Sequence, residues 1–98
     1  MTEGLIGKKI VAVTRSRPWI ILHGELVAAE GDVVEIKDAR CAVYYSTRTL
    51  GVLGLASDGP AKGSRISRRV DTAILCEVEL ILPSTPEASA RWAEEEWS

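Results

Sequence analysis

A chain of 98 residues has room for one domain, and its net charge of −2 lacks the positive field that draws proteins onto nucleic-acid duplexes. The apolar runs are far shorter than the ~20 residues of a membrane-spanning helix. A signal peptide is not expected, because the first residues lack a basic start followed by an apolar stretch. Because the only two cysteines, Cys41 and Cys76, form no framework, we expect both to lie reduced in the core; a disulfide or a reactive thiol is the alternative.

Alternating apolar and polar residues predict short strands at residues 9–14, 19–29, 33–37, 39–45 and 70–82. Gly24 lies in the middle of the second strand, where a strand bends sharply or a neighbouring backbone comes close. A tight hairpin turn is expected at 30–32, and a bend at Asp38 separates the two strands that follow it. Residues 49–56 are expected to form one or two helical turns, packing Leu50, Leu53 and Leu55.

The last predicted strand is expected to bury one face and to expose Glu77 and Glu79 on the other. The buried face would contain Ile74, Cys76, Val78, Leu80 and Leu82.

The C-terminal segment changes to a helical period. Thr85 followed by Pro86 is typical of an N-cap and a first-turn proline, and predicts a helix over residues 86–97. Trp92 and Trp97 on this helix are expected to dock either on the domain's own barrel or on another subunit.

Residues 21–39 resemble the first motif of Sm-like and SH3-like barrels. The shared pattern is an apolar residue, Gly24, a polar residue, Leu26, an acidic turn, and alternating apolar residues that end in Asp38-Ala39. Sm-type RNA binding relies on an Asn in that turn and on a late Arg-Gly pair, and this chain has neither. We therefore expect a mainly β fold: a small, strongly bent, five-stranded antiparallel barrel with a C-terminal helix. The single domain 1–98 would comprise a barrel at 8–83, with a long loop at 46–69, and the helix.

A second set of residues resembles an uncharacterised family of short phage and prophage proteins. The residues that carry this resemblance are, in order, the Gly24-x-Leu26 hairpin, Tyr44-Tyr45-Ser46-Thr47-Arg48, Leu50-Gly51-x-Leu53, Leu55-Ala56, Gly59-Pro60 and Leu82-Pro83. The resemblance implies a viral origin. The cysteine usage predicts a cytoplasmic location, which for a viral protein is the cytosol of the host cell.

The segment 46–69 carries five positive charges and one negative charge, which is unusual in an acidic protein. Arginine offers planar paired donors suited to phosphate, glycines let backbone N–H groups approach an anion, and tyrosines can stack on a base. The predicted ligand-binding residues are Tyr44, Tyr45, Ser46, Thr47, Arg48, Lys62, Ser64, Arg65 and Arg68. The alternatives are a solvated loop whose arginines pair with the chain's own acids, and a loop that contacts another protein.

No catalytic constellation is visible in the sequence. His23 is the only histidine and has no Cys or His at ligand spacing, so neither a metal nor any other cofactor is expected. It is expected on the polar face of its strand beside Glu25. The pair Glu77 and Glu79 is typical of a solvated strand face rather than an acid–base pair.

Together these features predict a non-enzymatic, phage-type binding protein that holds an anionic, nucleotide-derived ligand and sequesters a host immune signalling nucleotide. A homo-oligomer is expected because Ile21, Val27, Leu75, Ile81 and the helix tryptophans would expose much apolar area. The alternatives are a protein–protein interaction module, either a phage assembly part or an inhibitor of a host protein, and an Sm-like nucleic-acid binder. Neither a membrane nor a nucleic acid is the expected partner.

Overall fold

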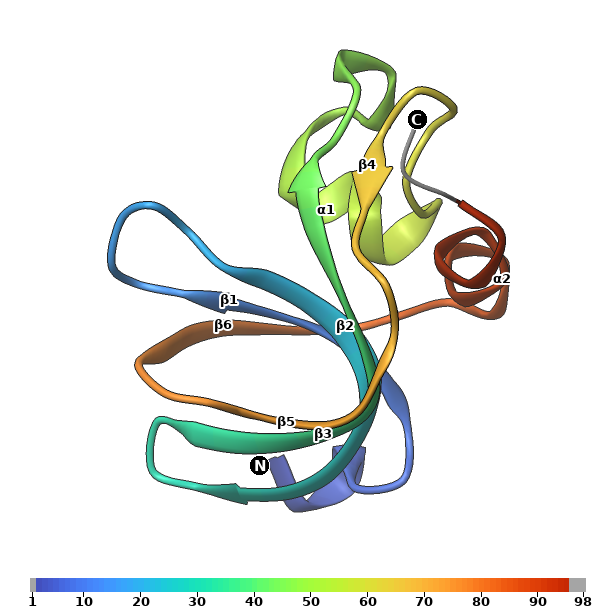
Figure 1. Cartoon of the computed structure of the whole chain (residues 1–98). Helices are drawn as coiled ribbons and strands as arrows, with labels where there is room; N and C mark the ends of the chain where they lie inside the picture. Colours follow the sequence, from blue (N-terminus) through green and yellow to red (C-terminus); the bar gives the residue numbers. More distant parts are fainter. Residues whose placement is uncertain (1, 96–98) are drawn as a thin grey trace.

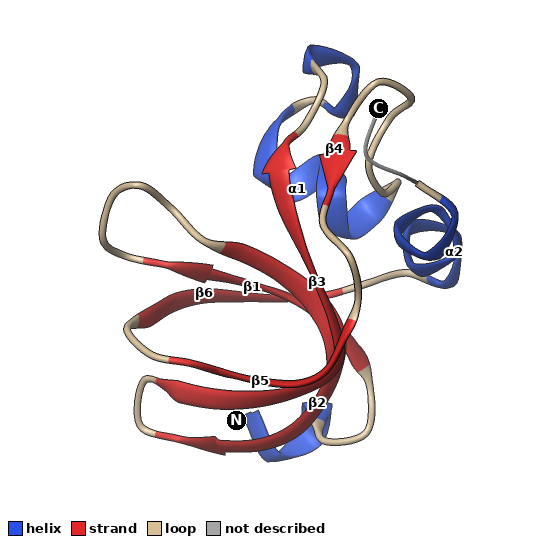
Figure 2. Cartoon of the chain, in the orientation of Figure 1, coloured by secondary structure: helices blue, strands red, loops and turns tan. Residues whose placement is uncertain are grey.

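The computed structural model describes residues 2–95 and consists of one strongly curved sheet with short helices at its upper end (Figure 1). The strands are β1 (Lys9–Thr14), β2 (Ile21–Glu30), β3 (Val33–Tyr44), β4 (Arg65–Ile66), β5 (Val70–Leu75) and β6 (Val78–Pro83). The α-helices are α1 (Gly51–Ser57) and α2 (Pro86–Glu94), and two 3-10 turns are η1 (Thr2–Leu5) and η2 (Thr47–Thr49) (Figure 2).

All strand pairs are antiparallel, and the neighbour order is β4-β3-β2-β1-β6, with β5 also pairing with β3. Between residues 2 and 95 no ladder joins β5 to β6, so the sheet has two free edges. The mainly β class and the strong bend are confirmed. The closed five-stranded barrel is wrong, because the predicted last strand is interrupted and its two halves pair with different neighbours.

The interruption lies at Cys76 and Glu77. Glu77 has a left-handed φ of 58°, and the N–H of Val78 donates to the carbonyl oxygen of Asp32 (2.9 Å). Because the chain turns here, the predicted buried face is wrong before the turn, where Leu75 is buried and Ile74 and Cys76 are exposed, whereas Val78 after the turn is buried as predicted. The expectation that both cysteines lie in the core therefore fails for Cys76, and Cys41 is half-buried.

The long strand β3 joins the two strands predicted on either side of Asp38. Asp38 has a φ of 54°, so the expected bend occurs within one strand rather than between two. Gly24 of β2 faces this bend, and a Cβ atom there would lie 2.5 Å from Ile36 Cγ2 and 2.6 Å from the Lys37 carbonyl oxygen. The close backbone approach predicted for Gly24 is therefore confirmed.

Two apolar clusters occupy opposite faces of the sheet. The first fills the concave side, with Ile10, Leu26, Val34 and Ile36 among its buried members. The second joins β1, β2 and β3 to the helices, and its members are Val11, Val13, Ile21, Ala42, Leu55, Ala56, Ile66 and Trp92. The strand β1 and the first half of β2 are consequently buried on both faces, and Ile21 and Leu75 are not the exposed outer-face residues expected from the sequence.

The helices cover the second cluster. Thr85 caps α2 as predicted, its hydroxyl oxygen accepting from the N–H of Ala88 (3.0 Å). Trp92 is fully buried and its indole N–H donates to the Leu55 carbonyl oxygen (2.9 Å), so it docks on its own domain. Trp97 lies outside the described residues. Of the three leucines expected to pack here, only Leu55 is buried, and Leu50 and Leu53 are exposed. Over residues 2–95 no helix has the length and apolar character needed to cross a membrane.

Candidate functional site

The basic segment forms a compact unit at the end of β3, which we call the cap (residues 44–66). In Figure 1 the ends of β3 and β4 extend away from the rest of the sheet and carry η2 and α1 between them. The ladder between β3 and β4 pairs Ala42 with Ile66 and Tyr44 with Arg65. The two ends of the cap are therefore held side by side by strand pairing.

Hydrogen bonds between two small polar side chains, Ser64 and Thr49, and the backbone order the cap. The N–H of Ser46 donates to Ser64 Oγ (3.0 Å), and the Ser64 hydroxyl donates to the carbonyl oxygen of Ala61 (2.7 Å). The N–H of Ala61 donates to Thr49 Oγ1 (3.1 Å). Because Ser64 and Thr49 are buried, these bonds fix the loop before β4 against η2.

The cap brings together part of the predicted ligand site. Tyr44 is 51% exposed and is the cross-strand neighbour of Arg65, which is also exposed. Thr47 and Arg48 follow in η2, and Lys62 precedes β4 in the loop tied to Ser46; all three are exposed. These five exposed side chains of the cap carry three positive charges, one aromatic ring and two hydroxyls.

The other predicted residues have structural roles or lie elsewhere. Ser64 is buried, and Ser46 caps η2 by accepting from the N–H of Arg48 (3.3 Å). Tyr45 is half-buried and packs against the second apolar cluster. Arg68 lies outside the cap, beside an earlier part of β3. Its neighbour Ser67 donates its backbone N–H to the carbonyl oxygen of Cys41 (2.8 Å).

One arginine of the segment pairs with an acid of the same chain. Arg69 forms an ion pair with Asp38 at the bend of β3 (2.5 Å). The alternative in which the arginines pair with the chain's own acids therefore holds for this residue.

Sequence reasoning missed the role of Arg40. Its Nε donates to the Ser67 carbonyl oxygen (2.9 Å), and its Nη1 donates to the carbonyl oxygens of Trp92 and Ala93 in the last turn of α2. One side chain thus joins β3, the segment after β4 and the C-terminal end of α2. A cation at that end also matches the helix dipole.

The prediction that His23 lies on the polar face of its strand is wrong, because His23 is buried beneath α2. Its ring stacks on the indole of Trp92, with centroids 5.0 Å apart and planes 12° apart. Its Nε2 lies 3.1 Å from Ser89 Oγ, which is 3.0 Å from Ser84 Oγ. Burial, with smaller contributions from nearby Lys9 and Arg40, lowers the pKa of His23 from 6.5 to about 4.

A serine hydroxyl beside an imidazole is the arrangement of a nucleophile and its base. Here the imidazole is covered by Trp92, and a base with a pKa of about 4 attracts a serine proton poorly near neutral pH. The pairing satisfies the polar atoms of a buried histidine. Among residues 2–95 no group of three His, Cys, Asp or Glu side chains could hold a metal ion.

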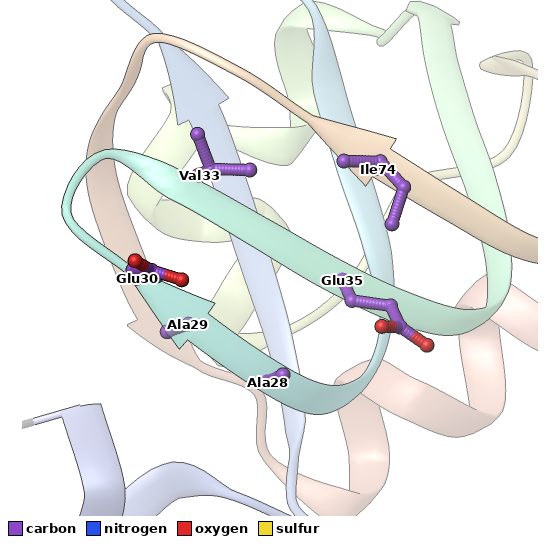
Figure 3. Close-up of a pocket in the computed structure, with 6 residues that line it drawn as sticks. All are labelled: Ala28, Ala29, Glu30, Val33, Glu35 and Ile74. Carbon is purple, nitrogen blue, oxygen red and sulfur yellow. The ribbon is translucent and has the colours of Figure 1, made fainter.

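A hollow lies at the other end of the sheet, on the outer face of β2, β3 and β5 (Figure 3). It measures about 440 Å³ including its open mouth, and its lining residues are Ala28, Ala29, Glu30, Val33, Glu35 and Ile74. Its walls are apolar and its charged groups are two carboxylates. This hollow does not suit an anion. No local pattern predicts it, because its residues come from three strands.

The comparison with protein families identifies the chain. Residues 7–92 match the DUF6948 family, a domain of unknown function, so the chain belongs to that family. The match begins just before β1 and ends at Trp92, and so includes both apolar clusters and the cap. Neither the curated proteins nor the solved structures gave a match. Membership in an uncharacterised family, which the resemblance described above implied, is confirmed.

Proposed function

We propose that this protein is a non-enzymatic, phage-type binding protein that holds an anionic, nucleotide-derived ligand on its cap. The observation that carries the proposal is the pairing of Tyr44 with Arg65 in the cap, whose backbone is ordered by Ser64 and which also carries the exposed Arg48 and Lys62. Each charge-assisted hydrogen bond to phosphate contributes roughly 1.5–3 kcal/mol, and stacking on a tyrosine adds about 1–3 kcal/mol per base.

An ordered scaffold favours binding over a solvated loop, because the entropy of arranging the backbone that carries the arginines is already lost in the free protein. Arg65 and Arg48 lie on different elements, so a phosphate between them would be held from two directions. We further propose that the protein works as a homo-oligomer in the host cytosol, where it sequesters a signalling nucleotide.

The test is binding of defined nucleotides, namely a cyclic dinucleotide, ADP-ribose and NAD, measured by calorimetry at low and high salt. We expect at least one to bind, with an affinity that falls as salt rises. Arg65→Ala and Arg48→Ala should each weaken binding at least tenfold. Arg17→Ala is the matched control, because Arg17 packs over Trp19 in the loop between β1 and β2. If none of the three binds at millimolar concentration, the proposal is wrong.

A second candidate, a protein-interaction module, is favoured by Leu50. This side chain is 79% exposed and its residue has a left-handed φ of 64°, which is costly for a residue with a Cβ atom. An exposed apolar side chain held in a costly conformation contributes little to the stability of the fold, so a role in contacting another protein would explain it.

A further inference from the structure

We propose that the free edge of β5 docks a second copy of this chain, whose own β5 adds antiparallel to it. Within residues 2–95, β5 pairs with β3 on one side and no strand pairs with its other side. An unpaired edge presents a row of N–H and C=O groups that another strand can join unless proline, lysine or a covering segment protects it. β5 has no proline and no lysine, and Asp71 is its only charged residue.

Large apolar side chains are exposed along this strand. Ile74 is 60% exposed and Val70 is 49% exposed, with the exposed Thr72 between them. The neighbouring positions Ala73 and Leu75 instead pack toward the concave core. The exposed side chains thus follow the two-residue period of a strand and would form one face of a longer sheet.

The sequence of β5 favours one symmetric register. In the joined sheet the outer faces of both copies must lie on the same side. A two-fold axis perpendicular to the sheet meets this condition and places one residue of β5 opposite the same residue of the second copy. The central candidates for that residue are Asp71, Thr72 and Ala73. An axis at Asp71 brings two like charges together, which is destabilising. An axis at Ala73 places Thr72 against Ile74 and Asp71 against Leu75.

The axis at Thr72 avoids both problems. It sets Val70 of each copy opposite Ile74 of the other, and the two Thr72 hydroxyls opposite each other. Apolar β-branched pairs and Thr–Thr pairs are favourable cross-strand neighbours, and each contributes roughly 0.2–1 kcal/mol. No like charges face each other in this register.

Charge complementarity supports the same arrangement. Two residues beyond Val70, Arg68 of the second copy would lie opposite Cys76, where β5 has ended. Because Leu75 pairs with Val34, Cys76 follows beside Val33, which in turn pairs with Glu30. Val33 and Glu30 line the hollow together with Glu35. The guanidinium group of the second copy's Arg68 would then face the carboxylates of Glu30 and Glu35 (Figure 3). By symmetry, Arg68 of the first copy would face the same two residues of the second copy.

This interface is argued without reference to a nucleotide, so it stands or fails independently of the proposed ligand. The shared ladder contains only the five residues Val70–Ile74 of each copy, and small interfaces are typical of weak association. We therefore expect a dimer of micromolar rather than nanomolar affinity.

The test is oxidative cross-linking of Thr72→Cys in a Cys76→Ser background, which removes the exposed native thiol. In the proposed register the two introduced thiols lie opposite each other, so a disulfide-linked dimer should form readily on mild oxidation without nucleotide. Val27→Cys in the same background is the control, because Val27 is exposed on β2, two strands away from the edge. Its cross-linking should be at least tenfold slower.

Sedimentation of the unmodified chain supplies the second measurement. Arg68→Glu should weaken association at least fivefold, and adding Glu30→Arg to that variant should restore most of it. The proposal is wrong if Thr72→Cys cross-links no faster than Val27→Cys. It is also wrong if Thr72→Cys instead cross-links to a cysteine placed at Leu80 of β6 in a mixed sample, since this would show pairing of β5 with the other free edge.

Discussion

The imidazole of His23 lies nearly parallel to the indole of Trp92, with the ring centroids 5.0 Å apart. His23 belongs to β2 and Trp92 to α2, so this contact fixes the C-terminal helix on the sheet. The Ser89 hydroxyl meets the same imidazole at Nε2 (3.1 Å), which satisfies a polar atom in an otherwise apolar contact. Stable attachment of α2 therefore requires a neutral histidine.

This requirement predicts a loss of stability in mild acid. The pKa of His23 is lowered to about 4 in the folded protein, against 6.5 for an ordinary histidine, so the unfolded chain binds a proton first as the pH falls. Stability should be unaffected by this group above about pH 6.5 and should decrease between about pH 6.5 and 4, by about 3 kcal/mol in total. Urea unfolding at a series of pH values measures the change.

The matched variant is His23→Gln, which retains a side chain able to hydrogen-bond to Ser89 but does not titrate in this range. The difference in unfolding free energy between the two proteins should depend on pH in the same window. Identical pH profiles for the two proteins would show that His23 does not carry the effect.

Arg40 is expected to contribute substantially to the attachment of α2. Arg40→Ala removes the donor to the carbonyl oxygens of Ser67 and Trp92, and hydrogen bonds to a charged group contribute about 1.5–3 kcal/mol each when measured by deletion. We expect a loss of about 2–3 kcal/mol in urea unfolding. Arg48→Ala, which changes the same charge at an exposed position in η2, should stay within about 0.5 kcal/mol of the unmodified protein. Equal losses in both variants would assign the effect to net charge.

The sequence predicted the local features of this fold well. The hairpin after β2, the bend at Asp38, the close approach at Gly24 and the Thr85 cap each depend on a few neighbouring residues, and each is present. The break at Glu77 was missed because every second residue from Ile74 to Leu82 is apolar and the segment contains neither Gly nor Pro. Its cause is a long-range pairing: β5 joins β3, whereas β6 joins β1.

The candidate site was predictable only as a cluster of charges. The sequence identifies the basic segment, but it does not separate exposed residues such as Arg48 from residues used for structure, such as Ser64. The role of Arg40 depends on carbonyl groups 52 and 53 residues away in the chain, so no local pattern could reveal it. The burial of His23 likewise depends on where α2 docks.

Leu50 provides a test of backbone strain at the cap. Because its φ of 64° is unfavourable for any residue with a Cβ atom, Leu50→Gly should raise the free energy of unfolding by about 1 kcal/mol. Leu53→Gly makes the same chemical change at an exposed position inside α1, where glycine should lower it by about 1 kcal/mol. Thermal unfolding of both variants checks the opposite signs, and a loss of stability in both would contradict the assigned strain.

Gly24 tests whether the curvature of the sheet requires close contact between β2 and β3. A methyl group at this position would lie within 2.6 Å of both Ile36 Cγ2 and the Lys37 carbonyl oxygen, and the backbone atom cannot move without disturbing the bend at Asp38. Gly24→Ala should therefore destabilise the protein by about 1–3 kcal/mol, as overpacking in a close-packed interior does. The control is Gly4→Ala in η1, where nothing lies within 4 Å of the added atom and stability should not change. If urea unfolding gives the same free energy for both variants, the two strands are not in close contact at this point and the sheet must bend by another means.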